Sequence, residues 1–389
     1  MVTFKLNSMN YLSLSIMAAV LLLLNGCTKD YQLSTDFTVP TELSSPAKVE
    51  LDVTSPNNIA LSWSGGGAND GSYVIYEVIF AKEGTTDLSE PVERIKSDFG
   101  AQAKLTLTHA ALNAIARKAG IKPGETGKIS WSVLTSKGGD VKDMDLNNDI
   151  EVTRGEGIDN MPNSLYLYGA GNESSGTQGS LFRKAADGVY IVYSKVAGSG
   201  ELELKGKIGE EEFGYYLDGT KLKEGAGVMN LTPNANPYRI TVDFNTLSVK
   251  TEIISNVRCI WGATYDVIGQ LAYVGDGKFV AANSAIRFID PSKPETNPPG
   301  WLSWIEERYY FIAAVNGADK CWGRMDGVSS ERPTGGEPLS FYEIGEFTWS
   351  QWDHLWKMKG DLNSKRATIT VNTNKENLMV HEFSNITNL

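Results

Sequence analysis

Short runs in which apolar and polar residues alternate dominate the first third of the sequence. These runs span residues 49–53, 59–63, 74–80 and 129–133. Period-two alternation sends successive side chains to opposite faces of a strand. The apolar face of two runs carries a tryptophan, Trp63 or Trp131. Short strands at regular spacing around two tryptophans predict a β-sandwich of immunoglobulin type over residues 47–155.

One segment of this region has helical periodicity instead. Residues 109–119 place four apolar side chains on one helical face, and Gly120 follows as a stop signal. These side chains are Ala111, Leu112, Ile115 and Ala116. We expect one short helix within an otherwise all-β fold.

Two glycines, charged residues and a proline interrupt the regular pattern at residues 154–162, which indicates a domain boundary. Beyond this boundary, a pattern of three strands occurs twice in the same order. The first strand is apolar and ends in or near a glycine, the second begins with a glycine, and the third is rich in β-branched residues. The six strands are residues 165–169, 188–193 and 238–244, then 259–262, 277–280 and 366–372. This weak repeat predicts two tandem β-sandwich domains, 162–256 and 257–389, the second with a proline-rich insertion at 290–304.

The N-terminus carries a short apolar segment, residues 11–24, that is preceded by Lys5 and ends in Leu24-Asn25-Gly26-Cys27. The segment is too short to cross a bilayer and is typical of a secretory signal. Leucine at −3 and glycine at −1 before cysteine look like the lipobox of bacterial lipoproteins. This predicts a signal peptide over residues 1–26, lipidation of Cys27 and a polar tether over 27–46. The alternative is an ordinary signal peptide whose cleavage site happens to hold a cysteine.

Charge and residue counts narrow the function classes. The chain has 36 basic and 47 acidic residues, a net charge of −11, which disfavours nucleic acid as a partner. The three histidines lack metal-ligand spacing, so we expect no metal site and no cofactor. In an exported protein Cys259 and Cys321 either form a disulfide or remain two buried thiols.

Tryptophan is concentrated towards the C-terminus. Seven of the nine tryptophans lie beyond residue 260: Trp261, Trp301, Trp304, Trp322, Trp349, Trp352 and Trp356. A small sandwich core does not need so many, so some should be exposed. Exposed flat aromatic rings suit sugars, because the apolar face of a pyranose stacks on the ring while its hydroxyl groups meet polar side chains.

Prolines and a glycine accompany Trp301 and Trp304 in the segment 298–304. These residues favour a loop, where a tryptophan is seldom fully buried. Trp301 and Trp304 are therefore the first candidates for ligand contact, the alternative being a loop folded back over its own core. Trp261 and Trp322 each precede a glycine in strand-like stretches, and we expect them in the core.

The second cluster, Trp349, Trp352 and Trp356, has spacings of three and four residues. These spacings would align the three rings on one helical face, as either a core stripe or a ligand platform. On a platform, the neighbouring Asp353 and His354 would supply hydrogen bonds. Arg308 is a candidate polar partner.

Motifs of catalysis do not stand out. The sequence contains neither G-x-S-x-G nor H-E-x-x-H, and no pair of carboxylates is marked as a facing acid and base. Residues 143–149 imitate the start of a calcium loop but lack the glycine and glutamate that such a loop requires, so we expect a solvated loop. We predict no catalytic residues.

These features together resemble the SusE/SusF family of surface glycan-binding lipoproteins from Gram-negative polysaccharide-utilisation systems. The resemblance lies in the lipobox, the polar start Thr28-Lys29-Asp30, the helix before the strand at 127–133, and the tandem sandwiches. The stretches that match best are 47–152, 307–314 and Trp322-Gly323. The Lys29-Asp30 pair is similar to the signal that sends such lipoproteins to the cell exterior.

The resemblance implies a lipid-anchored outer-membrane protein that faces the cell exterior and binds starch or another glycan without catalysis. Its two C-terminal sandwiches would be similar to carbohydrate-binding modules, beside a SusC/SusD-type transporter. The first of them has almost no tryptophan, so we expect the site in the last. Two alternatives remain: a glycoside hydrolase or polysaccharide lyase with an unrecognised site, and a structural lipoprotein of the uptake complex.

Overall fold

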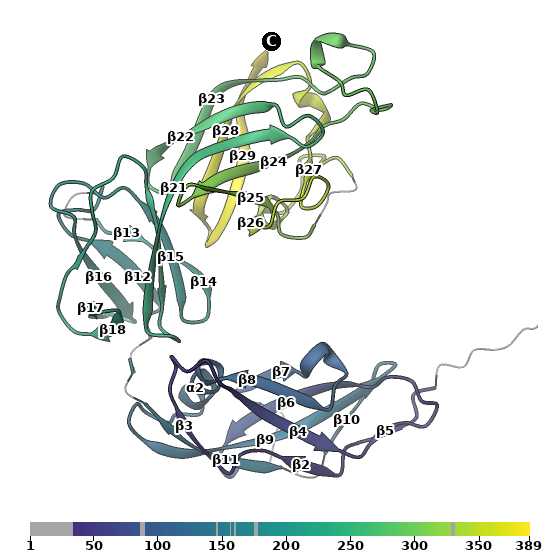
Figure 1. The fold of residues 1–389 in the computed structure, drawn as a ribbon, viewed down its shortest axis with the longest axis vertical. Coiled ribbons are helices and arrows are strands. Elements are labelled where there is room, and N and C mark those ends of the chain that lie inside the picture. The colour runs from purple at the N-terminus through teal and green to yellow at the C-terminus, as the bar shows by residue number, and fades with distance from the viewer. Residues whose placement is uncertain are drawn as a thin grey trace, which may run out of the picture. The chain divides into compact units, whose positions relative to one another are not determined.

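A computed structural model describes residues 34–85, 90–144, 147–155, 157–158, 161–174, 178–327 and 331–389. Within these residues strands predominate and there is a single α-helix, so the predicted all-β fold is confirmed (Figure 1). The predicted signal peptide, Cys27 and Lys29-Asp30 lie outside the described residues.

The chain divides into two compact units. One takes in the residues up to Pro46, Ala60–Thr106 and Ser130–Asp149, and the other Ala47–Ile59, Leu107–Ile129 and Ile150–Leu389.

Among the residues that the structure describes, eleven strands precede residue 155. They are β1 Phe37–Thr38, β2 Glu42–Ser44, β3 Lys48–Leu51, β4 Asn58–Ser64, β5 Gly67–Ala68, β6 Ile75–Lys82, β7 Glu93–Lys96, β8 Lys104–Thr108, β9 Thr126–Lys137, β10 Asp140–Asp143 and β11 Asn148–Arg154. The largest sheet has the order β3-β11-β9-β6-β7, and β2-β4-β8 form a second. Trp63 and Trp131 are buried, as their strand patterns predict.

The predicted helix is α2, His109–Lys118. Thr108 caps its N-terminus, because its Oγ1 accepts a hydrogen bond of 3.1 Å from the Ala111 amide. Leu112, Ile115 and Ala116 are buried on the predicted apolar face.

Strands β12 to β21 of the described residues surround one hydrophobic core. They are β12 Ser164–Tyr168, β13 Ser180–Leu181, β14 Arg183–Ala186, β15 Val189–Ser194, β16 Glu201–Ile208, β17 Glu211–Asp218, β18 Lys221–Glu224, β19 Met229–Asn230, β20 Tyr238–Asp243 and β21 Ser248–Trp261. β13-β12-β16-β17-β18 form one sheet. Phe244 packs edge-on against Tyr190 and Tyr215 at the centre of this core.

The remaining strands surround a second core. They are β22 Val267–Gly275, β23 Lys278–Ile286, β24 Arg308–Val315, β25 Ala318–Arg324, β26 Ile344–Phe347, β27 Trp356–Lys357, β28 Lys365–Lys375 and β29 Leu378–Asn388. Three 3-10 turns connect them: η2 Pro294–Thr296, η3 Leu339–Tyr342 and η4 Gly360–Leu362. β14-β15-β20-β21-β22-β23-β28-β29 are consecutive neighbours in one sheet, to which β24–β27 attach.

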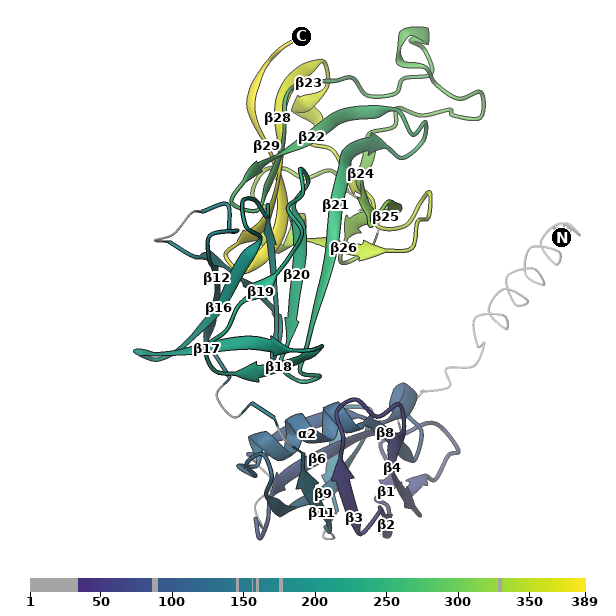
Figure 2. The same cartoon turned by 60° about the vertical axis from the view of Figure 1, so that its left-hand side comes forward.

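Strand β21 belongs to both cores. Its first half, Ser248–Ile253, pairs with β20, and its second half, from Ile254, pairs with β24 and β22. Figure 2 shows it as one long strand. The predicted boundary between residues 256 and 257 falls inside this strand, and the domain limits remain a prediction.

The two cysteines of this region are free and buried, so the disulfide alternative is wrong. Cys259 pairs with Phe311 of β24, whereas Cys321 pairs with Ile312 from the other side of β24. One strand therefore separates the two thiols. Burial raises the pKa of Cys321 to about 12 and that of Cys259 well above its usual value.

Candidate functional site

Three connections of the last core carry its exposed aromatic residues. They are the β21–β22 turn, the long segment between β23 and β24, which Figure 1 shows as a green excursion with a short helical turn, and the β26–β27 segment. Asn297 Nδ2 donates to Asp266 Oδ2 at 3.3 Å, and Gln351 Nε2 donates to the Gly262 carbonyl at 3.4 Å. The β21–β22 turn is thus hydrogen-bonded to both other segments.

Glycine at 262 permits the close approach of these connections. A Cβ on Gly262 would lie 2.5 Å from Leu355 Cδ2, which is shorter than any van der Waals contact. Leu355 is buried in the core, so the β26–β27 segment is anchored directly on the turn.

Three tryptophans of these connections form one group, which we call the tryptophan cluster. Trp301 is 51% exposed, Trp304 46% and Trp352 38%. The ring centroids of Trp301 and Trp304 are 6.0 Å apart with planes at 54°, and those of Trp301 and Trp352 are 5.7 Å apart at 83°. The fold therefore brings Trp352 to the two residues predicted first, although 48 residues or more separate them in the sequence.

A second exposed pair lies on the same connections. Trp349 is 50% exposed, and its ring meets Tyr265 edge-on at 5.7 Å. The indole Nε1 of Trp349 donates to the buried Tyr310 hydroxyl at 2.5 Å. The sequence did not single out Tyr265 and Tyr310 as candidates, because tyrosine is common in strands. The one local sign was Gly262, which indicated a turn close to Tyr265.

The predicted helical stripe at residues 349–356 is wrong. The segment forms bends and then strand β27, in which Trp356 pairs with Tyr309 of β24. Trp356 is fully buried, stacks on Tyr309 and donates its Nε1 hydrogen to the Phe341 carbonyl at 2.8 Å. Trp356 is therefore a core residue and no ligand platform. Trp261 and Trp322 are buried as expected.

A buried carboxylate that the sequence analysis missed supports the cluster. Glu306 is 1% exposed and accepts hydrogen bonds from Trp304 Nε1 at 2.8 Å and Arg308 Nη1 at 2.7 Å. The sequence contains one sign of this arrangement. Trp304, Glu306 and Arg308 are spaced two residues apart, and this spacing places their side chains on the same side of an extended chain. The predicted polar partner Arg308 is thus held beside Trp304.

The predicted Asp353 lies on the exposed side of the β26–β27 segment, where it accepts a hydrogen bond from Ser350 Oγ at 2.7 Å. His354 turns the other way. Its ring stacks on Phe347 at 3.6 Å, and its Nδ1 lies 2.9 Å from the Arg324 carbonyl. Only Asp353 of the two can offer acceptors next to Trp352.

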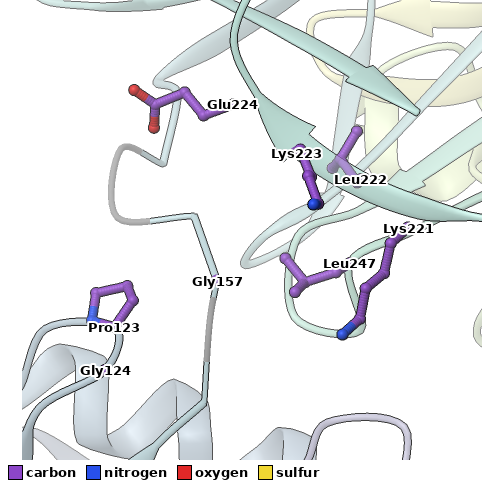
Figure 3. A pocket seen from close by; sticks show the side chains of 8 residues that line it. All are labelled: Pro123, Gly124, Gly157, Lys221, Leu222, Lys223, Glu224 and Leu247. Atoms are coloured by element: carbon purple, nitrogen blue, oxygen red, sulfur yellow. The ribbon is translucent and has the colours of Figure 1, made fainter. Parts of the chain in front are cut away.

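Several pockets lie elsewhere among the described residues. One of about 330 Å³ includes Lys221, Leu222, Lys223 and Leu247, and none of the described residues that line it is aromatic (Figure 3). Another of about 340 Å³ is lined by residues that include Tyr309 and His381. Among the described residues no three His, Cys, Asp or Glu side chains gather as a metal site, and residues 145–146 of the calcium-like loop lie outside them.

The family match to known proteins lies in the N-terminal part of the chain. Residues 28–134 match the model of the SusE outer membrane protein family. No curated protein matches the chain. Among solved structures, the crystal structure of SusF from Bacteroides thetaiotaomicron aligns with 91% of this chain and 76% of its own, at 13% identity and a TM-score of 0.24. At that TM-score the alignment carries no argument about fold or function.

The family match ends well before the tryptophan cluster and concerns only the N-terminal part of the chain. In the part of the chain that the structure describes, no helix has the length and apolar character needed to cross a membrane. The resemblance drawn from the sequence is confirmed over residues 28–134, which match the SusE outer membrane protein family.

Proposed function

We propose that this protein binds a glycan at the surface of the outer membrane, without catalysis, and that the tryptophan cluster is its binding site. The observation that carries the proposal is the partial exposure of three neighbouring tryptophans, in which the Trp301 ring meets both Trp304 and Trp352. Three large apolar rings held in water are costly unless a ligand covers them, and sugar rings suit such surfaces.

The angles within the cluster favour a soluble, flexible chain over a flat crystalline surface. Ring planes at 54° and 83° cannot all stack on one plane, whereas a chain that turns between successive sugars can meet each ring in turn. Asp353 follows Trp352 in the chain, and the Arg308 guanidinium shares the Glu306 carboxylate with Trp304. Both groups suit sugar hydroxyl groups, which donate and accept hydrogen bonds.

The setting in the cell belongs to the same proposal. The family match at residues 28–134, the lipobox and the polar start after Cys27 support a lipid-anchored protein on the outer face of the membrane. A transporter of SusC/SusD type is the partner that would take up the captured glycan. A net charge of −11 favours neutral glycans over anionic ones.

The first test is retention of the purified protein in native gels that contain amylopectin or other soluble polysaccharides, followed by Kd measurements. We expect Trp301→Ala and Trp304→Ala each to cost about 1–3 kcal/mol, roughly 5- to 150-fold in Kd. Phe99→Ala is the matched control, because Phe99 is 93% exposed but lies far along the chain from the cluster, between β7 and β8.

Three results would contradict the proposal. Unchanged retention of both tryptophan variants would remove the site assignment. Release of reducing ends from a polysaccharide would favour a hydrolase or lyase. Absence of binding to every glycan, together with stable co-purification with a transporter, would favour a structural lipoprotein.

A further inference from the structure

We propose that Glu306 is the positioning residue of the tryptophan cluster: its buried carboxylate holds the Trp304 ring and the Arg308 guanidinium in the orientation in which they meet a ligand. The proposal rests on the function proposed above, but the geometry that it concerns can be measured without any ligand.

The carboxylate of Glu306 is fully engaged. Oε2 accepts from Trp304 Nε1 at 2.8 Å and from Arg308 Nη1 at 2.7 Å. Oε1 accepts from the backbone amides of Glu307 at 3.1 Å and Arg308 at 3.0 Å. Four donors therefore converge on two oxygens, and the side chain has one orientation that satisfies them all.

The backbone beneath this carboxylate is also held. Glu306 and Ile289 exchange two hydrogen bonds, with N–O distances of 2.8 Å and 3.0 Å, in an isolated antiparallel bridge. Glu306 thus joins the two ends of the long segment that carries Trp301 and Trp304. The backbone from which the carboxylate extends is therefore fixed at this position.

The contact with Trp304 orients the ring without covering it. The indole nitrogen faces the protein, while 46% of the residue remains exposed. Because the Nε1 hydrogen is already donated, a sugar can approach Trp304 only through the ring faces or the carbon edge. A ring held in this way loses less freedom when a ligand binds, which favours affinity.

A neutral amide cannot replace the carboxylate. Glutamine at position 306 would carry one acceptor oxygen and one NH₂ group, and the NH₂ group would face at least one of the present donors. The ion pair with Arg308 would also be lost. Release of the Trp304 and Arg308 side chains is the expected outcome, since the two backbone amides cannot move away.

The next residue offers a matched control. Glu307 is 4% exposed and accepts from Arg332 Nε at 2.9 Å, and neighbouring side chains of an extended chain point to opposite sides. Glu307→Gln therefore neutralises a buried carboxylate that is paired with an arginine, while the hydrogen bond between Glu306 and Trp304 stays in place.

The experiment compares Glu306→Gln and Glu307→Gln in the full chain by two readouts. The first is the ¹⁵N spectrum of the indole groups, with the Trp304 signal assigned from Trp304→Phe. We expect the Trp304 signal to shift in Glu306→Gln and to stay in place in Glu307→Gln. The second is retention by amylopectin, which should weaken about 3- to 10-fold in Glu306→Gln and less than 2-fold in Glu307→Gln, with thermal melting as the check of folding.

An unmoved Trp304 signal in folded Glu306→Gln, or equal losses of retention in both variants, would overturn the proposal. Should Glu306→Gln fail to fold, hydrogen exchange of the wild-type protein provides the test. If the Trp304 indole hydrogen exchanges with solvent as fast as in the urea-unfolded chain, the hydrogen bond to Glu306 is not formed and the proposal is contradicted. If the wild type binds no glycan at all, the proposed function fails, and the indole signal still decides whether Glu306 positions Trp304.

Discussion

At the scale of single residues, the buried polar groups of the last core have defined roles. His381 is 2% exposed, its Nε2 lies 2.7 Å from the Tyr309 hydroxyl, and its ring meets Trp356 at 4.4 Å. Burial lowers the pKa of His381 to about 3, because the charged imidazolium would be removed from water. The imidazole is therefore neutral in the folded protein over the whole physiological range.

This burial predicts acid sensitivity. The unfolded chain takes up a proton on His381 below a pH of about 6.5, whereas the folded protein does so only near 3. The unfolded state thus binds more protons in this window, and the free energy of unfolding falls as the pH drops. We expect His381 to account for a loss of about 2 kcal/mol between pH 7 and pH 5. Urea unfolding at both pH values measures it, and a pH dependence that persists unchanged in His381→Gln would contradict it.

Neighbouring tyrosines permit a second prediction at this scale. Tyr309 and Tyr310 are both buried, but only the Tyr310 hydroxyl accepts the indole hydrogen of Trp349. Tyr309→Phe and Tyr310→Phe should each lower the free energy of unfolding by about 1 kcal/mol. Only Tyr310→Phe should loosen Trp349, seen as greater acrylamide quenching relative to a Trp349→Phe background. Equal quenching in both variants would count against the anchoring role of Tyr310.

At the scale of elements, local sequence patterns predicted correctly those helices and strands whose stability depends on interactions within one segment. The helix at 109–119 was found as α2, His109–Lys118, because its cap, apolar face and terminal glycine lie within one segment. The stripe at 349–356 has helical spacing but forms no helix. Its end pairs with β24 through Tyr309, and His354 has a positive φ of 58°, so contacts with distant strands override the local period.

The cap of α2 can be tested directly. Thr108→Ala removes the oxygen that accepts from the Ala111 amide, and we expect a loss of about 1 kcal/mol in the free energy of unfolding. Thr108→Ser keeps the oxygen and should cost far less. Denaturant unfolding of the three proteins provides the measurement, and equal stability of the alanine and serine variants would refute the capping role.

At the scale of the molecule, the two C-terminal cores are mechanically connected. β21 runs through both, and Arg239 of β20 bonds to Glu252 of β21 at 2.7 Å and to Glu346 of β26 at 2.6 Å. Strain or loss of packing in one core should therefore reach the other. The repeat in the sequence indicated two similar units but contained no sign of the shared strand.

This connection predicts joint unfolding. Ile240 is fully buried in the first of these cores, and Ile240→Ala should cost about 2–5 kcal/mol. Seven of nine tryptophans lie beyond residue 260, so tryptophan fluorescence reports mainly on the second core. We expect the fluorescence transition of Ile240→Ala to shift to lower urea together with the circular dichroism transition. A fluorescence transition that stays in place would show two independent cores.

The sequence by itself determined the strand-rich class, the single helix, the resemblance of the N-terminal part and the concentration of tryptophan near the C-terminus. All of these features depend on composition or on hydrophobic periodicity over a few residues, and such periodicity determines the local secondary structure. Only the tertiary structure decided that Trp301, Trp304 and Trp352 meet while Trp356 is buried, and that Glu306 holds Trp304. The exposure of a side chain and its contacts depend on which distant segments of the chain cover it. Local hydrophobic periodicity contains no information about those segments.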